Sequence, residues 1–76
     1  MSAHTLRDLL DRLVTEMIKG RITLDEGRQA LESRLIERAV HHAGGHLGHA
    51  ADQLGIHRNT LARKMTEYDI RLSGKG

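Results

Sequence analysis

The sequence predicts an all-α protein of four helices, in which two longer helices precede two short ones. Apolar residues recur at spacings of three and four through residues 5–43, as they do along one face of a helix. The chain contains no proline and no strand-like alternation of polar and apolar residues, and its glycines divide it into segments of helical length. Its 76 residues form one domain at most, so we assign residues 1–76 to a single domain.

The first expected helix covers residues 5–19. One broad face of it is apolar and is formed by Leu6, Leu9, Leu10, Leu13, Val14, Met17 and Ile18. Gly20, between Lys19 and Arg21, is typical of a helix end, where cations are favoured. A chain of this size has too little other apolar material to cover such a face, so we interpret the face as a dimer interface. The alternative is packing within one chain.

The second expected helix covers residues 24–43. Thr23 and Glu26 form the pattern of a capping box, in which the two side chains satisfy each other's backbone amides. Gly27 costs up to about 1 kcal/mol relative to alanine inside a helix, and it suggests a close crossing with another helix. The pair that follows residue 43, Gly44-Gly45, ends the helix. Its apolar positions are Leu24, Leu31, Leu35, Ile36, Ala39, Val40 and Ala43.

The composition supports dimerisation. The chain has no Phe or Trp, Tyr68 is its one aromatic residue, and it has no cysteine for a disulfide or a thiolate metal site. Below about 70–80 residues a single core seldom contributes more than about 3–5 kcal/mol, and association of two chains is a common remedy. We therefore expect residues 5–43 to form a dimer core. The predicted interface residues are Leu6, Leu9, Leu10, Leu13, Met17, Leu31 and Leu35.

Two short helices that cross around a tight turn are predicted next. The first covers residues 47–54 and the second about residues 58–68. Ala50 and Ala51 are small enough to let the helices approach, and Gly55 can adopt a turn conformation that costs other residues energy. This is the pattern of a helix-turn-helix, whose second helix enters the major groove of DNA. The apolar residues expected to pack around the turn are Leu54, Ile56, Leu61, Met65 and Tyr68.

Several blocks of residues between 24 and 71 fall in register with one known family. They are Leu35–Val40 (LIERAV), Gly44-Gly45, Ala50–Ile56 (AADQLGI), Arg58–Leu61 (RNTL) and Arg63-Lys64. These blocks resemble the Fis-type domain, which is found in the nucleoid protein Fis and at the C-terminus of NtrC-type activators. The resemblance implies a homodimer with its first two helices as the core, a helix-turn-helix at about residues 46–68, and recognition helices in successive major grooves of bent DNA.

The resemblance also assigns contacts to DNA. Arg58 is implied to read guanine, because a guanidinium can bond O6 and N7 together. Thr60 is implied to contact phosphate, and Asn59 phosphate or a base. The pair Arg63-Lys64 is implied to hold the flanking backbone. The remaining DNA-binding positions are His57 and the backbone amides near Leu47 and Gly48, at a helix start where phosphate binds readily.

Three residues depart from the family pattern. His46 and His57 stand at capping positions where many relatives carry Asn or Ser, and histidine caps less well than those residues. Ala62 stands where Fis has a basic residue, which removes one phosphate contact. Histidine changes its charge between about pH 5 and pH 8. We therefore hypothesise that DNA binding strengthens on acidification if either histidine touches phosphate.

Charge is distributed unevenly along the chain. Residues 1–43 carry seven Lys or Arg and seven Asp or Glu, whereas residues 44–76 carry five basic and three acidic residues, a net of +2. From His57 to Lys64 there are three basic residues and no acid. A local positive patch of this kind predicts an anionic partner. The alternative is a dimeric helical protein-interaction module without DNA binding, and the acid-free basic segment speaks against it.

Enzymatic and metal-binding functions are not expected. The acids are scattered over helix faces, no nucleophile stands beside a base, and the chain has no phosphate-binding glycine loop. Six histidines are present, but structural zinc normally takes four ligands that include cysteine, so we expect neither a metal nor a cofactor. No run of about 18 apolar residues exists, so no membrane span is expected.

The sequence therefore predicts sequence-influenced binding of double-stranded DNA by a cytoplasmic homodimer located at the nucleoid. Such a protein acts as a transcriptional regulator or a DNA-bending nucleoid protein, with RNA polymerase or another regulator as a further partner. No ATPase domain precedes the motif in this sequence, so the chain is either a freestanding Fis-like protein or one domain of a longer regulator. The Gly- and Ser-rich tail, residues 73–76, is expected to fray.

Overall fold

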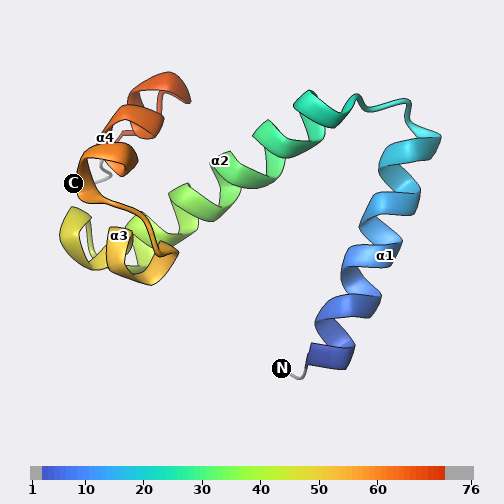
Figure 1. The fold of residues 1–76 in the computed structure, drawn as a ribbon, viewed down its shortest axis with the longest axis horizontal. Coiled ribbons are helices and arrows are strands. Elements are labelled where there is room, and N and C mark those ends of the chain that lie inside the picture. Colours follow the sequence, from blue (N-terminus) through green and yellow to red (C-terminus); the bar gives the residue numbers. More distant parts are fainter. Residues whose placement is uncertain (1–2, 72–76) are drawn as a thin grey trace.

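The computed structural model describes residues 3–71, with side chains from residue 5 onward. Four helices make up this part of the chain: α1 (Ala3–Lys19), α2 (Leu24–His42), α3 (Leu47–Leu54) and α4 (Arg58–Glu67) (Figure 1). The predicted all-α class is confirmed, and the helix boundaries lie within about two residues of those expected, which is the ordinary scatter at helix ends. The tail expected to fray, residues 73–76, lies outside the described residues.

The first helix stands apart from the other three. Figure 1 shows α1 and α2 as two arms joined by a short connection, with α3 and α4 gathered at the C-terminal end of α2. The main contacts between helices join α2 to α3, α3 to α4 and α2 to α4. The two short helices and the second half of α2 therefore form one packed unit, to which α1 contributes little.

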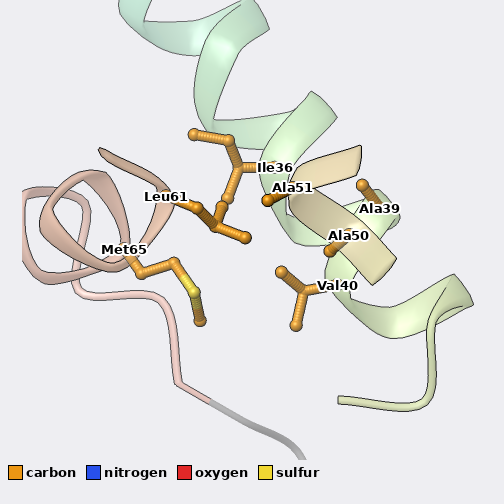
Figure 2. Close-up of a cluster of buried hydrophobic side chains, with 7 residues drawn as sticks. All are labelled: Ile36, Ala39, Val40, Ala50, Ala51, Leu61 and Met65. Carbon is orange, nitrogen blue, oxygen red and sulfur yellow. The ribbon is translucent and has the colours of Figure 1, made fainter. Parts of the chain in front are cut away.

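Small and branched side chains build the core of this unit (Figure 2). Its buried members are Ile36, Ala39 and Val40 of α2, Ala50 and Ala51 of α3, and Leu61 and Met65 of α4. Ala50, Ala51 and Leu61 are exposed by only 0%, 2% and 0%. The two alanines thus allow the close approach of α3 that the sequence predicts, because a larger side chain would hold the helices apart. The partly buried residues around this core include Leu54, Ile56, Tyr68 and Ile70.

The predicted capping box at the start of α2 is confirmed. The Glu26 amide donates to Thr23 Oγ1 at 3.1 Å, and the Thr23 amide donates to Glu26 Oε1 at 3.0 Å. Each side chain therefore satisfies a backbone amide that has no partner within the helix. The Thr23 amide, and the Thr23 hydroxyl that donates to the same oxygen at 3.0 Å, lower the pKa of Glu26 below its ordinary value of 4.5.

All four helices end in the same pattern of hydrogen bonds, the Schellman motif. In α1 the Ile22 amide donates to the Met17 carbonyl at 3.0 Å, and the Arg21 amide donates to the Ile18 carbonyl at 3.1 Å. The stop expected at Gly20 is displaced by one position, because Arg21 takes the left-handed conformation with a φ of 59°. The other three helices place Gly44, Gly55 and Asp69 at the left-handed position.

Two of these ends use a residue with a side chain where glycine is usual. The left-handed conformation costs such a residue roughly 1–2 kcal/mol. Arg21 and Asp69 are each followed by an isoleucine, and a hydrophobic contact from that next position is a common part of the motif. Ile70 packs against the core, and Ile22 lines a groove between α1 and α2. We infer that these isoleucines hold the two turns in place.

Gly27 faces the end of α1 and the connection that follows it, and the close helix crossing that the sequence suggests stays a prediction. A Cβ atom at this position would lie 3.0 Å from Met17 Cε and 3.7 Å from Ile22 Cγ2. The α1–α2 connection therefore folds back against α2 at the one position in this turn of the helix that lacks a side chain.

Large apolar side chains remain exposed on α1 and on the first half of α2. The predicted interface leucines, Leu6, Leu9, Leu10, Leu13, Leu31 and Leu35, are 42–54% exposed, and Met17 is half-buried. Leu10, Leu13, Met17 and Leu31 line one groove of about 520 Å³ between α1 and α2, which we call the α1–α2 groove. The other three predicted interface residues, Leu6, Leu9 and Leu35, lie outside it.

None of the helices between residues 3 and 71 is long and apolar enough to cross a membrane.

Candidate nucleic-acid interface

Helix α4 has one buried and one free face. Leu61 and Met65 are buried in the core, whereas Asn59, Ala62, Arg63 and Thr66 are exposed. Successive residues of an α-helix are about 100° apart, so these four exposed residues share the side of α4 that is opposite the core. No acid occurs on this face before Glu67. The free face can therefore approach a polyanion without meeting a carboxylate along its first two turns.

The two arginines of α4 are available to an external partner. Arg58 occupies the first helical position, is exposed, and forms no ion pair with any residue of the described chain. Arg63 Nε lies 4.0 Å from Glu67 Oε2, and both side chains are more than half exposed. An exposed pair at this distance contributes little, so the Arg63 guanidinium can turn to a phosphate at small cost.

The N-cap of α4 is His57. Its Nδ1 accepts a hydrogen bond from the Asn59 amide at 3.0 Å. A neutral imidazole that accepts at one nitrogen carries its proton on the other, so Nε2 of this ring can donate to a phosphate oxygen. A doubly protonated ring would gain charge and lose the cap. The hypothesis that acidification strengthens binding through His57 remains a prediction, with this cap as an opposing effect.

The start of α3 is built in the same way. His46 Nδ1 accepts from the His49 amide at 3.1 Å, and the two imidazole rings stack with centroids 4.0 Å apart. The amides of Leu47 and Gly48 belong to the first turn, where no acceptor exists within the helix. Both residues are half-buried, and their amides remain the predicted phosphate site.

Lys64 differs from the two arginines because it is partly buried and has a partner on another helix. Its Nζ donates to Glu32 Oε2 of α2 at 2.8 Å, and Tyr68 Oη donates to the same oxygen at 2.7 Å. The two hydrogen bonds, that of Lys64 above all, hold the pKa of Glu32 below its ordinary 4.5. The bond to Glu32 raises the pKa of Tyr68 above its ordinary 10.0.

The structure thus divides the predicted DNA contacts into three groups. His57, Arg58, Asn59 and Arg63 are exposed at the start and on the free side of α4. Thr60 and Lys64 are half-buried on its flank, and Leu47 and Gly48 lie on α3. Sequence reasoning missed Glu32, since it lies 32 residues from Lys64 and looks like an ordinary solvent-facing acid in the helix pattern. Among the described residues, no three His, Cys, Asp or Glu side chains gather into a cluster that could hold a metal ion.

A short helix, a left-handed turn at Gly55 and a second helix with a free basic face define a helix-turn-helix protein. A sequence model described as "Bacterial regulatory protein, Fis family" matches residues 28–68, and the chain belongs to this family. Over 49 residues, 64% of the chain, it is 39% identical to the nitrogen fixation protein AnfA of Azotobacter vinelandii. The match spans 9% of the length of that relative. No solved structure matches the chain.

Proposed function

We propose that this protein binds double-stranded DNA and regulates transcription, with α4 as the element that enters the major groove. The observation that carries this proposal is the free face of α4, where Asn59 and Arg63 are exposed, together with Arg58 at the exposed start of the same helix; neither arginine has a competing buried carboxylate. Membership of a family of bacterial regulatory proteins supports the same function. A helix of this diameter fits the major groove of B-DNA, and the groove displays a different pattern of donors and acceptors for each base pair.

The groups on α4 and at the start of α3 can each be assigned an expected contact with DNA. Arg58 reads guanine, because it stands at the start of the recognition helix, where base contacts concentrate in helix-turn-helix proteins. From the free face, Asn59 contacts a base or a phosphate, and Arg63 contacts the flanking phosphates. The ring of His57 and the amides of Leu47 and Gly48 add phosphate contacts that fix the register without reading sequence. Thr60 contacts phosphate from the flank of the helix.

We further propose that the protein is a homodimer held together by α1 and the first half of α2. The exposed residues there are large and contiguous, and the α1–α2 groove is lined almost entirely by apolar side chains. The packed unit leaves these residues uncovered, and contiguous apolar surface of this kind marks an interaction site. A second copy of the chain presents the same apolar face, so the two faces can cover each other. Two chains then present two recognition helices to one duplex.

The experiment that tests DNA binding is selection from a randomised duplex library at two salt concentrations. Three proteins are compared: the wild type, Arg58→Ala, and the control Arg12→Ala, which removes the same charge from the exposed polar side of α1. We expect the wild type and the control to enrich one short palindrome-like site, and Arg58→Ala to lose about 10-fold or more in preference for it, since one bidentate base contact contributes about 1–3 kcal/mol.

Other outcomes have clear meanings. Enrichment that survives in Arg58→Ala would contradict the assignment of Arg58 as the base-reading residue. Binding without any enriched site would indicate an architectural protein that holds the backbone. No binding by the wild type at either salt concentration would contradict the proposed function and favour a helical module that binds proteins through α1 and α2.

A further inference from the structure

Among the residues whose side chains the structure describes, one ion pair joins elements that are distant in the sequence. Glu32 of α2 accepts from Lys64 and Tyr68 of α4, and the side chains of Glu32 and Lys64 are only 26% and 24% exposed. We call these three residues the Glu32 brace. The other ion pairs join residues two to four positions apart and are more than half exposed: Lys19–Glu16, Arg28–Asp25, Arg63–Glu67 and Arg71–Asp69. The brace is therefore the ion pair with the geometry to influence how α4 sits on α2.

The brace lies on a different side of α4 from the free face. Lys64 is about 100° around the helix from Arg63 and about 140° from Asn59. Tyr68 follows Lys64 by four residues and thus shares its side of the helix. This side faces α2, where the two donors meet one carboxylate oxygen. The Lys64 side chain is therefore fixed toward α2 and does not point toward a phosphate that Arg63 would hold.

Moving Lys64 to a phosphate would have a cost that moving Arg63 would not. The Glu32 carboxylate would lose its cation at a half-buried position, with Tyr68 as its one remaining donor in the brace. Removal of one partner from a partly buried pair is more expensive than breaking an exposed pair, because water compensates the remaining charge less well. The phosphate contact would have to exceed this loss before it contributed any affinity.

We propose that Glu32 is a positioning residue, which uses Lys64 and Tyr68 to fix the angle between α2 and the recognition helix, and that Lys64 serves recognition through this angle and not through a phosphate. This inference rests on the proposed DNA binding. It changes the role that the family resemblance gives to Lys64.

The position of Glu32 on α2 connects the α2–α4 angle with the proposed dimer. Its neighbour Leu31 lines the α1–α2 groove, through which we propose that two chains associate. The brace thus links the dimer face of α2 directly to α4. In a dimer, the α2–α4 angle sets the separation and tilt of the two recognition helices. Dimeric helix-turn-helix proteins need their half-sites about 34–36 Å apart, so a small tilt reduces discrimination between sites before it reduces general affinity for DNA.

The first test needs no DNA. A double-mutant cycle of Glu32→Gln, Lys64→Gln and the double variant, measured by denaturant unfolding at constant protein concentration, gives the coupling between the two side chains. We expect a coupling of about threefold or more in the unfolding equilibrium constant, which corresponds to a real interaction between contacting residues. A coupling factor of one, within error, would show that the two side chains do not interact and would overturn the brace.

The second test separates orientation from phosphate contact. The salt dependence of duplex binding is compared for Lys64→Gln and for its neighbour Arg63→Gln, with the preference for the selected site over random duplex measured in parallel. Each lost phosphate contact reduces the log–log slope by about 0.9. We expect Arg63→Gln to reduce the slope and Lys64→Gln to leave it unchanged while lowering the site preference several-fold. A slope reduced equally by both variants would overturn the proposal.

A charge exchange provides the rescue. Glu32→Lys and Lys64→Glu are expected to lose site preference singly and to recover most of it when combined, because the pair is then restored in the opposite sense. If Lys64 were a phosphate ligand, the exchange would still place a carboxylate against phosphate and binding would stay weak. A wild-type chain that binds no duplex would overturn the proposed function and the recognition role, while the cycle measured without DNA would still decide whether the brace exists.

Discussion

At the scale of single residues, the basic groups of α4 differ in what they are free to do. Arg58 and Arg63 are exposed on the helix, whereas Lys64 is held by Glu32. The acid-free run from His57 to Lys64 could be recognised from the sequence alone, because charge in a short segment can be counted along the chain. The partner of Lys64 could not be predicted, since it depends on how α2 and α4 pack and not on any local pattern.

The brace has a pH dependence whose sign follows from its hydrogen bonds. The pKa of Glu32 is lowered, so its contribution to stability is present above the ordinary value of 4.5 and is lost as the pH falls through the lowered value. The pKa of Tyr68 is raised, so its contribution is present below the ordinary value of 10.0 and is lost as the pH rises. We expect the difference in free energy of unfolding between wild type and Glu32→Gln to be constant between these values and to shrink beyond them.

Denaturant unfolding of both proteins across this pH range checks the prediction. Glu26 also has a lowered pKa, but it is present in both proteins, so its effect cancels in the difference. A difference that stays constant below pH 4 would show that ionised Glu32 does not contribute through the brace.

At the scale of the helices, the caps control where each element begins and ends. Thr23 and Glu26 could be recognised as a capping box from the sequence, because the pattern is local and its chemistry specific. The left-handed positions at Arg21 and Asp69 were not predicted, since neither is glycine. The signal that could have found them is the isoleucine after each one, which supplies the apolar contact of the motif.

The histidine cap of α3 yields a second prediction. Replacement of His46 by alanine removes the acceptor for the His49 amide, and we expect it to lower the free energy of unfolding by about 1 kcal/mol. His46→Asn supplies a better capping side chain and is expected to be equal to or more stable than the wild type. Thermal unfolding at fixed concentration, followed by circular dichroism, compares the three proteins. Equal stability of the alanine and asparagine variants would contradict a capping role.

At the scale of the whole molecule, the apolar residues divide between an internal core and an exposed surface. Ile36, Val40 and Leu61 build the internal core, while Leu13 and Leu31 remain on the surface around the α1–α2 groove. The core could be predicted well, because the helix-turn-helix positions recur at fixed spacing. The separation of α1 from that core could not, because periodicity shows that a face is apolar and not what covers it.

The proposed dimer predicts the effect of a charge in that groove. Leu13→Glu would bury a carboxylate without a partner, so we expect it to raise the dimer dissociation constant at least about tenfold. Sedimentation over a range of concentrations measures this constant. Thr15→Glu is the control, since Thr15 lies about 160° around α1 from Leu13 and does not line the groove. A wild type that remains monomeric at all concentrations would contradict the dimer.

The central claim is that α4 enters the major groove of double-stranded DNA, and methylation protection tests it most directly. Dimethyl sulfate modifies guanine at N7, which lies in the major groove, and adenine at N3, which lies in the minor groove. On the selected site we predict protection of guanine N7 in two patches separated by about 10–10.5 base pairs, and loss of that protection with Arg58→Ala. Unprotected guanines on a duplex that the protein demonstrably occupies would contradict the account.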